Sequence, residues 1–388
     1  MNNSIFLTSP LRVMIPIIKI VGNFCNCRCD YCFYHAKDQS IFHTMSDELL
    51  ERFIEQYMEL FSGQLTFIWH GGEPLLAGLN FFQKIINIQS RNLRDGQSIR
   101  NHVQTNGILI DDRWAEFLRV HNFRVGISLD GNRESHNRFR KDKMGRRTFD
   151  RVMRGIEILR GHDIEPGIIQ TITRDSIKWI KDDFDFFTNN LKINGWGINV
   201  YFDQEKVNEN MLGQNVTTED LSEFLINYID LWFLKDDSNL RIREIENFIS
   251  GIFEKMAPNC TFNGLCTSYF CLDYDGKIYP CDRLSDSFDY SFGDLSKRSI
   301  LEILNGTRRL KYAKNVNFLH ADCAICEWQK ACHNGCSAQR IGSLRGKYYY
   351  CEARKKIFEY LGNKVENLNE KTAQAAVEEE KCQSAKRL

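Results

Sequence analysis

Cysteines are the residues of this chain most able to do chemistry, and they are grouped along it. The chain has 388 residues and 14 cysteines. Four cysteines lie between Cys25 and Cys32, nine lie between Cys260 and Cys351, and Cys382 stands alone near the end. In a long chain, such grouping indicates metal or redox chemistry more often than disulfide bonds.

The first group has the spacing of an iron–sulfur site. Cys25, Cys29 and Cys32 follow the pattern C-x-x-x-C-x-x-C. Three thiolates can hold three irons of a [4Fe–4S] cluster and leave the fourth iron open to a cofactor or substrate. Zinc is the alternative, although zinc sites usually close with four protein ligands. Cys27 lies off this spacing, and we interpret it as a bystander that packs as a small hydrophobic residue.

This loop resembles the signature of the radical S-adenosylmethionine (SAM) superfamily. In that superfamily the open iron binds SAM, and one electron cleaves SAM to a 5′-deoxyadenosyl radical. The resemblance extends to HGGEP at 70–74, QTNG at 104–107, SLDG at 128–131 and an arginine in HNRFRKD. Taken alone, these segments are also typical of turns and of a solvated surface. The resemblance implies SAM contacts from Gly71, Gly72, Glu73, Gln104, Asn106, Ser128, Asp130 and Arg140, the last through the SAM carboxylate.

The second cysteine group resembles the SPASM domain, which binds two auxiliary [4Fe–4S] clusters. The resemblance assigns the first auxiliary cluster to Cys260, Cys266, Cys281 and Cys336. It assigns the second to Cys323, Cys326, Cys332 and Cys351. Each cluster then has four thiolates and no open iron, and two zinc sites are the alternative. Cys271 and Cys382 remain spare.

Asp282 directly follows a cysteine in the segment YPCD. In the sulfatase-maturating relatives the matching Asp is the proposed general base. A carboxylate near a desolvated cluster can have the raised pKa that a base requires. A turn cap is the alternative role.

The elements that must position these residues alternate between strands and helices. Apolar patterning predicts strands over 13–21, 64–70, 102–105, 124–129, 167–173 and 196–201. It predicts helices over 81–89, 112–120, 148–160, 177–189 and 217–234, and a helix after 44–47, where Thr44 and Asp47 form a capping box. Repeated βα units predict an α/β fold, namely a partial (β/α)6 barrel with its chemistry at the C-terminal strand ends. We expect this barrel at 1–235, the cysteine-rich iron–sulfur domain at 236–360, and a charged, flexible tail at 361–388.

Composition limits the partners and the location. Lys and Arg together number 51, as do Asp and Glu, so no net field favours nucleic acid or an anionic membrane. No apolar stretch is long enough to span a bilayer, and the first residues lack the features of a signal peptide. We therefore expect a cytoplasmic protein that binds neither nucleic acid nor membrane.

The resemblance points to two related activities. CFYH at 32–35, LAGLNFF at 76–82, QTNGILID at 104–111 and YPCD at 279–282 resemble anaerobic sulfatase-maturating enzymes, which oxidise a Cys or Ser of a sulfatase to formylglycine. Those enzymes usually have QGGEPT where this chain has HGGEPL, and an aromatic-rich stretch where it has Arg283 and Leu284.

WHGGEPLLAG and CDRL instead resemble SPASM maturases of ribosomally synthesised precursor peptides, including cross-linking enzymes. We therefore favour oxidative maturation of a precursor peptide, with a sulfatase maturase as the alternative. Both activities imply a peptide or protein substrate and an electron donor such as flavodoxin or ferredoxin. A non-catalytic iron–sulfur or zinc scaffold is a third hypothesis, which does not require the GGEP segment.

Overall fold

A single curved sheet organises the protein. The computed structural model describes residues 13–36, 42–204, 213–253, 255–285 and 288–385. In this part of the chain ten strands form one sheet in the order β10-β9-β8-β1-β2-β3-β4-β5-β6-β7. Neighbouring strands from β8 to β7 are parallel, whereas β9 and β10 add in antiparallel fashion. The strands are β1 (Ile15–Lys19), β2 (Gly63–His70), β3 (Gln97–Thr105), β4 (Arg124–Ser128), β5 (Gly167–Ile172), β6 (Gly195–Val200), β7 (Arg241–Ile242), β8 (Tyr269–Asp273), β9 (Lys277–Tyr279) and β10 (Gly293–Asp294).

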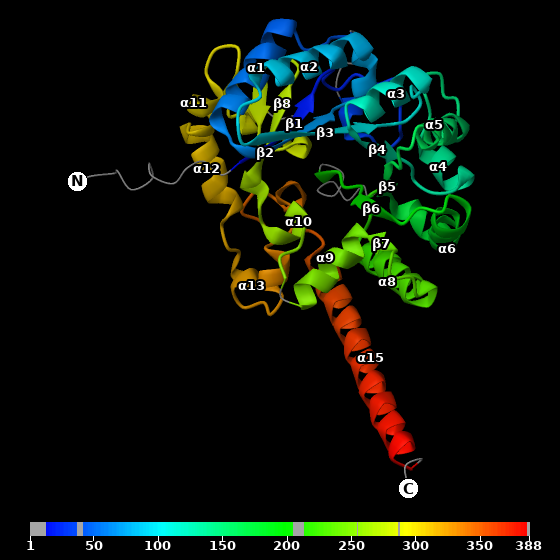
Figure 1. Cartoon of the computed structure of the whole chain (residues 1–388). Helices are drawn as coiled ribbons and strands as arrows, with labels where there is room; N and C mark the ends of the chain where they lie inside the picture. The colour runs from blue at the N-terminus through cyan, green and yellow to red at the C-terminus, as the bar shows by residue number, and fades with distance from the viewer. Residues whose placement is uncertain (1–12, 37–41, 205–212, 254, 286–287, 386–388) are drawn as a thin grey trace, which may run out of the picture.

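Helices of the first half cover the outer face of this sheet (Figure 1). They follow the strands in the expected βα alternation, which confirms the predicted α/β fold with a parallel sheet. They are α1 (Asp47–Leu60), α2 (Leu79–Asn92), α3 (Asp112–Val120), α4 (Arg133–Phe139), α5 (Phe149–Gly161), α6 (Ile180–Asp185), α8 (Thr218–Lys235) and α9 (Arg243–Ile252).

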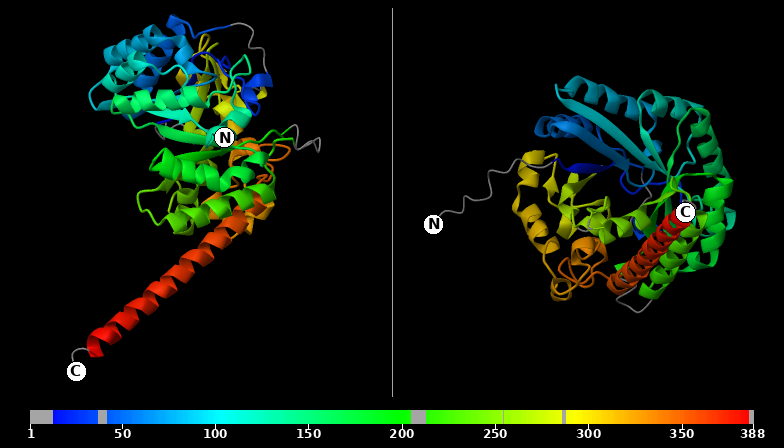
Figure 2. Two further views of the ribbon diagram at one scale, coloured as in Figure 1. Left: turned by 90° about the vertical axis from the view of Figure 1, so that its right-hand side faces the viewer. Right: turned by 60° about the horizontal axis from the view of Figure 1, so that its bottom comes forward.

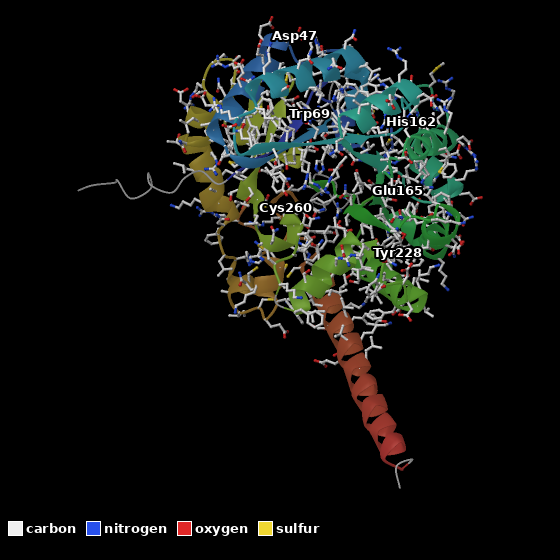
Figure 3. The ribbon with its side chains drawn as sticks, viewed as in Figure 1. Asp47, Trp69, His162, Glu165, Tyr228 and Cys260 are labelled. Carbon is white, nitrogen blue, oxygen red and sulfur yellow. The ribbon has the colours of Figure 1, made fainter. Side chains whose placement is uncertain are left out.

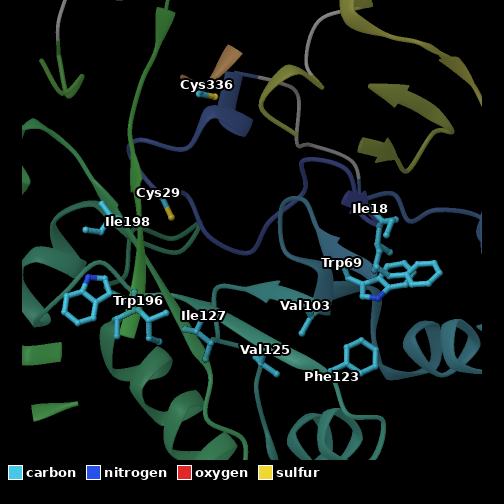
Figure 4. Packing of buried hydrophobic residues seen from close by; sticks show 14 of the residues in the cluster. Ile18, Cys29, Trp69, Val103, Phe123, Val125, Ile127, Trp196, Ile198 and Cys336 are labelled. Atoms are coloured by element: carbon cyan, nitrogen blue, oxygen red, sulfur yellow. The ribbon is translucent and has the colours of Figure 1, made fainter. Parts of the chain in front are cut away.

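The strands send alternate side chains to the helices and to the barrel interior. In β2, Phe67 and Trp69 are fully buried on the helix side, whereas His70 points to the other face. In β3 the same alternation buries Val103 and leaves Gln104 on the inner face. Figure 4 shows Trp69 and Val103 within this packed layer. The period of two therefore brings polar residues to the inner face at the C-terminal strand ends.

Three local expectations differ from the structure. Ser46, and not Thr44, caps α1, because its side chain accepts from the Leu49 amide at 3.2 Å. The region predicted as one helix over 177–189 divides into a 3-10 turn, α6 and a π-helical turn (Phe186–Asn190). The helix α4 was not predicted, and the Asn132 side chain caps it.

The cysteine-rich half joins the same sheet. β8 pairs in parallel with β1 along its whole length, with Cys271 opposite Ile17. The remaining elements are short, and Figure 3 shows Cys260 at the start of α10, well away from Trp69 in β2. They are α10 (Cys260–Asn263), α11 (Ile300–Leu304), α12 (Thr307–Val316), α13 (Ala321–Ala324) and α14 (Gln329–Cys332).

The last helix, α15 (Cys351–Ala385), begins at a cysteine and projects from the rest of the protein (Figure 2). It extends through most of the segment that we expected to be a flexible tail. Its first turns are integrated with the core, because Ile357, Phe358 and Leu361 are fully buried. Among the described helices, none combines the length and apolar character that a membrane crossing needs.

Candidate active site

The loop after β2 holds the first cysteine loop in place. The Gly72 amide donates to the Gly22 carbonyl at 2.9 Å, and the Glu73 amide donates to the Phe24 carbonyl at 2.9 Å. A Cβ atom at position 72 would stand 2.0 Å from the Phe24 carbonyl oxygen, so this approach requires glycine. Gly71 adopts a φ of 106°, which also favours glycine. Gly72 and Glu73 lie in the segment expected to contact SAM. Their amides thus hold the cysteine loop in place through backbone hydrogen bonds.

Glu73 links the end of β3 to the same loop. Its buried carboxylate accepts from the Thr105 hydroxyl at 2.8 Å and from the Asn106 amide at 2.7 Å. Burial raises the pKa of Glu73 to about 7. The Asn106 side chain then donates to Asn26 Oδ1 at 2.7 Å and to Cys25 Sγ at 3.6 Å. Asn106, an expected SAM contact, therefore lies against Cys25, and Glu73, another expected SAM contact, binds the Asn106 amide.

The thiols of Cys25, Cys29 and Cys32 share one environment. Burial, followed by the charges of Cys29 and Cys25, raises the pKa of Cys32 to about 12. A hydrogen bond from the Cys27 thiol is the largest influence that lowers the pKa of Cys29, and Arg140 acts in the same direction. Cys27, interpreted from the sequence as a bystander, thus lies between two of the expected ligands. Figure 4 labels Cys29 beside the apolar core.

Two further expected SAM contacts are paired with each other. Arg140 donates from Nε to Asp130 Oδ2 at 2.8 Å and from Nη2 to Asp130 Oδ1 at 3.0 Å. The Tyr31 hydroxyl donates to Oδ2 at 2.5 Å, and the Thr171 amide donates to Oδ1 at 2.9 Å. The Arg140 guanidinium therefore binds the Asp130 carboxylate in a bidentate manner, and both residues are buried. Arg140 and Asp130 support the cysteine loop through Tyr31 in this arrangement.

Gln104 and Ser128 occupy the inner face of neighbouring strands. The Gln104 side-chain amide donates to the Ser128 hydroxyl at 3.2 Å. Gln104 is the last residue but one of β3 and Ser128 ends β4, so both lie at the edge where a parallel sheet normally binds its ligand. Their placement agrees with the SAM-contacting position that the resemblance implies.

Asp282 meets two residues that the sequence analysis did not single out. The Tyr34 hydroxyl donates to Asp282 Oδ1 at 2.6 Å, and His70 Nδ1 stands 3.9 Å from Asp282 Oδ2. The Tyr34 oxygen and His70 Nδ1 are 3.5 Å apart. Burial, followed by the Asp282 charge, raises the pKa of Tyr34 well above its usual range. Tyr34 lies in CFYH, which borders the cysteine loop, and His70 lies in HGGEP, which borders the end of a strand. These positions were the sequence signal that could have identified the two residues.

The eight cysteines that the SPASM resemblance assigns to the auxiliary clusters fall into two spatial groups. Burial, followed by the charges of Cys336 and Cys266, raises the pKa of Cys260 to about 12. Burial and the same two neighbours also raise the pKa of Cys281. One cavity is lined by the other four, which are Cys323, Cys326, Cys332 and Cys351. The grouping agrees with the two sets that the SPASM resemblance implies, and thiols gathered in fours fit four-iron clusters.

Buried arginines accompany these thiols. Arg354 donates to Cys332 Sγ at 3.4 Å and to the Thr261 carbonyl at 2.7 Å. Burial, followed by the charge of Cys336, raises the pKa of Cys266, and the buried Arg340 opposes this rise. Cations beside thiolates favour the charged form that binds iron. Cys271 is fully buried in β8, and the Cys382 side chain lies outside the described part of the chain.

Comparisons with known proteins agree with this geometry. Residues 19–186 match the model of the radical SAM superfamily, and residues 264–337 match that of the SPASM iron–sulfur cluster-binding domain. The cysteine-type anaerobic sulfatase-maturating enzyme of Clostridium perfringens is 31% identical over 358 residues, covering 89% of this chain and 95% of that protein. The chain belongs to the radical SAM/SPASM family that contains the anaerobic sulfatase-maturating enzymes.

Other members of this radical SAM/SPASM family extend the comparison. The serine-type anaerobic sulfatase-maturating enzyme of Bacteroides thetaiotaomicron is 28% identical over 383 residues, covering 91% of this chain and 89% of that protein. The solved structure of native anSMEcpe with bound AdoMet and Cp18Cys peptide has a TM-score of 0.84 and 30% identity, covering 92% of this chain and 99% of that chain. Radical SAM and SPASM domains bind SAM and [4Fe–4S] clusters, and three clusters are consistent with this family.

The family comparison supports the alternative activity better than the preferred one. The sequence analysis favoured a precursor-peptide maturase over a sulfatase maturase. SuiB of Streptococcus suis, solved with its precursor peptide SuiA, is only 15% identical with a TM-score of 0.62, which shows a shared fold alone. HGGEPL and CDRL are short segments, and the sulfatase-maturase likeness extends over nearly the whole chain. The relatives therefore support the alternative, a radical SAM enzyme that modifies Cys or Ser in a protein.

Proposed function

We infer that this enzyme oxidises a Cys or Ser side chain of a sulfatase polypeptide to formylglycine. The observation that carries this proposal is the Asp282 carboxylate, held by Tyr34 at 2.6 Å next to Cys281 of an auxiliary cysteine group. A base placed between the two cysteine regions suits an oxidation that releases both protons and electrons. The cysteine-type and serine-type names of the relatives support the same substrate class.

The reaction requires a balanced removal of two electrons and two protons. A Cys side chain, –CH₂SH, and one water become –CHO and H₂S, whereas a Ser side chain, –CH₂OH, becomes –CHO directly. When bound, SAM and its cluster supply a radical that takes one hydrogen atom from the side-chain carbon, and an auxiliary cluster can accept the remaining electron. The protein must therefore remove one further proton from the thiol or hydroxyl.

Asp282 is the residue placed for that proton. Its Oδ1 accepts the short hydrogen bond from Tyr34, which leaves Oδ2 as the oxygen that faces His70 at 3.9 Å. Tyr34 is neutral because burial raises its pKa, so it donates to the carboxylate and does not compete for the proton. Tyr34 orients the base in this proposal, and His70 borders the space that the substrate enters.

The remaining assignments belong to the same proposal. Cys25, Cys29 and Cys32 hold the SAM-binding cluster, and Gln104, Asn106 and Ser128 contact SAM. The two groups of four cysteines hold the auxiliary clusters. A flavodoxin or ferredoxin supplies the reducing electron in the cytoplasm, where thiols stay reduced.

The test is an anaerobic assay of the reconstituted enzyme with SAM and a chemical reductant. The substrates are three versions of one sulfatase active-site peptide, with Cys, Ser or Ala at the modified position. We expect aldehyde formation on the Cys or Ser peptide, measured by mass spectrometry, together with 5′-deoxyadenosine. The Ala peptide is the control and should give no aldehyde.

Two results would contradict the proposal. If deoxyadenosine formed without aldehyde on either peptide, formylglycine formation would be excluded as the activity. A product that loses two hydrogens and keeps its sulfur would instead support a cross-linking peptide maturase.

A further inference from the structure

A loop between α4 and α5 lies against the first cysteine loop. The Arg28 amide donates to the Lys141 carbonyl at 2.7 Å, and the Lys143 amide donates to the Asn26 carbonyl at 3.2 Å. Cys27 forms an antiparallel bridge with the residue between those two partners, Asp142. Backbone pairing thus fixes the side chains of the 140–148 loop beside the expected catalytic cluster.

These two loops concentrate positive charge in a chain whose charges balance overall. Two carboxylates, Asp30 and Asp142, face six cations, of which Arg28, Lys141, Lys143, Arg146 and Arg147 lie in the loops and Arg151 lies in the first turn of α5. Arg140 of the same loop is buried and is taken up by Asp130. Asp142 is buried and pairs with Arg146 at 2.8 Å and Arg151 at 2.9 Å, while Asp30 pairs with Lys141 at 3.0 Å. Within the described part of the chain, no carboxylate pairs with Arg28, Lys143 or Arg147. We call these six cations the basic surface.

The basic surface reaches the cysteine loop through an open cavity. A cavity of about 340 Å³ is lined by Cys25 and Phe24 from the cysteine loop and by Lys143 and Met144 from the facing loop. The Lys143 ammonium lies 3.6 Å from the centre of the Phe24 ring. Met144 is 77% exposed. Arg146 and Arg151 line the same cavity. An exposed, adaptable methionine beside arginines is typical of a protein-docking surface.

We propose that the basic surface docks a small acidic one-electron carrier protein that reduces the catalytic cluster. This proposal rests on the proposed function, in which SAM cleavage consumes one electron. The carrier loses that electron and the cluster gains it, and no bond is formed or broken at the docking surface. Cys25 lines the same cavity as Lys143, so a docked carrier stands next to a cluster ligand.

Charge complementarity explains why the carrier is acidic. Opposite potentials steer association and raise the encounter rate, and this effect weakens with salt. Electron-transfer encounters use small and transient interfaces, which suits a patch formed by two loops. Lys143, Arg146 and Arg151 line the same cavity as Met144, so acidic residues on the carrier would lie beside a small apolar contact.

The test compares two double variants with equal changes in charge. Lys143→Glu/Arg147→Glu reverses two exposed cations of the basic surface. Lys311→Glu/Lys314→Glu reverses two exposed cations on α12 and is the matched control. The probe is purified flavodoxin, and its dissociation constant with reconstituted enzyme is measured by fluorescence anisotropy at low and moderate salt. Deoxyadenosine formation is measured with limiting flavodoxin and, separately, with dithionite.

We expect the Lys143/Arg147 variant to bind flavodoxin about tenfold more weakly and to lose most of its salt dependence. Its flavodoxin-driven SAM cleavage should fall in parallel, while dithionite-driven cleavage stays at the wild-type level. The Lys311/Lys314 variant should behave as wild type in every measurement.

Equal flavodoxin affinity in the two variants would overturn the proposal. Loss of dithionite-driven cleavage by the Lys143/Arg147 variant would also overturn the proposal. The surface would then support the cluster itself. Weaker peptide substrate binding with unchanged flavodoxin binding would assign the surface to an acidic substrate instead. Failure of the wild-type enzyme to cleave SAM with dithionite would refute the proposed function and not the docking surface.

Discussion

The first cysteine loop and the auxiliary cysteine groups are positioned in different ways. Gly22 and Phe24 of the first loop accept backbone hydrogen bonds from the segment after β2, and Asn26 pairs with Lys143 of the facing loop. Most auxiliary cysteines lie on helices of four residues, such as α10, α13 and α14, or on turns, whereas Cys351 begins the long helix α15. Their close neighbours include one another and buried arginines such as Arg354. The fold preorganises the catalytic loop, whereas the auxiliary half depends more on what its thiols bind.

This difference has an energetic consequence. Where metal ligation replaces part of a hydrophobic core, the free energy of metal binding becomes free energy of folding. Removing iron should therefore disturb the auxiliary half much more than the strand-end scaffold. The following predictions test this contrast, beginning with the largest effect.

Replacing Cys25, Cys29 and Cys32 together with Ala should abolish SAM cleavage. Iron content should fall by about four of about twelve atoms, because one of three clusters is lost. The barrel should keep its fold, since backbone hydrogen bonds hold the loop. The measurements are iron analysis, deoxyadenosine yield and circular dichroism.

The matched variant is Cys281→Ala/Cys336→Ala in the first auxiliary group. It should lose auxiliary iron and lower the stability of the cysteine-rich half, measured by proteolysis and thermal unfolding. If the triple variant still cleaved SAM, the first cysteine loop would have no role in the chemistry. Equal loss of structure in the two variants would refute the contrast between the regions.

Asp282 joins the two regions, and Asp282→Asn should separate radical formation from substrate chemistry. The variant should still bind SAM and still form deoxyadenosine. Aldehyde product should fall by roughly a hundredfold, the usual contribution of a positioned general base. The readout is the ratio of modified peptide to deoxyadenosine, measured beside iron content.

His70→Gln is the control for Asp282→Asn, since sulfatase maturases usually have Gln at that position. It should keep the product ratio close to that of the wild type. An unchanged ratio in Asp282→Asn would exclude Asp282 as the base, and loss of auxiliary iron would make its role structural.

Gly72→Ala should disturb the preorganised loop without touching a ligand. The added Cβ would stand 2.0 Å from the Phe24 carbonyl oxygen, so the loop or the backbone after β2 must move. Overpacking of this kind costs about 1–3 kcal/mol of stability. SAM cleavage should fall as the cysteine loop shifts, and chemical denaturation measures the loss of stability.

Gly161→Ala provides the comparison, because a Cβ there meets nothing within 4 Å. That variant at the end of α5 should be neutral or slightly stabilising. If Gly72→Ala were equally neutral, the loop would be less tightly held than its contacts indicate.

The sequence could predict much of the barrel but little of the junction between the halves. Strands such as β2 were predictable because buried residues alternate with inward ones, and α3 because its apolar residues recur with helical spacing. β8 to β10 have five residues or fewer, and their register depends on pairing with β1 and with one another and not on their own pattern. Short strands of this kind carry too little periodicity to be assigned in advance.

The candidate site divides in the same way. The cysteine sets followed from spacing and resemblance, because a ligand motif is local in sequence. The contacts of Asp282 with Tyr34 and His70 join residues that are far apart in the chain. The motifs CFYH and HGGEP contain Tyr34 and His70, but no local pattern indicates that these residues meet Asp282. The pairing of Arg140 with Asp130 was missed because HNRFRKD also fits a solvated surface.

Cys27→Ala should have the smallest effect, and it tests the limits of the preorganised loop. The Cys27 amide donates to Cys25 Sγ at 3.3 Å, and this backbone contact survives the substitution. The side chain is buried and its thiol approaches Cys25 and Cys29, but its spacing gives it no ligand role. Removing one buried sulfur should cost about 1 kcal/mol of stability and leave iron content and SAM cleavage near normal. Cys271→Ala, at an equally buried spare cysteine in β8, is the matched control for that packing loss. If Cys27→Ala lost a whole cluster while Cys271→Ala kept all its iron, Cys27 would be a ligand and the three-cysteine assignment would be wrong.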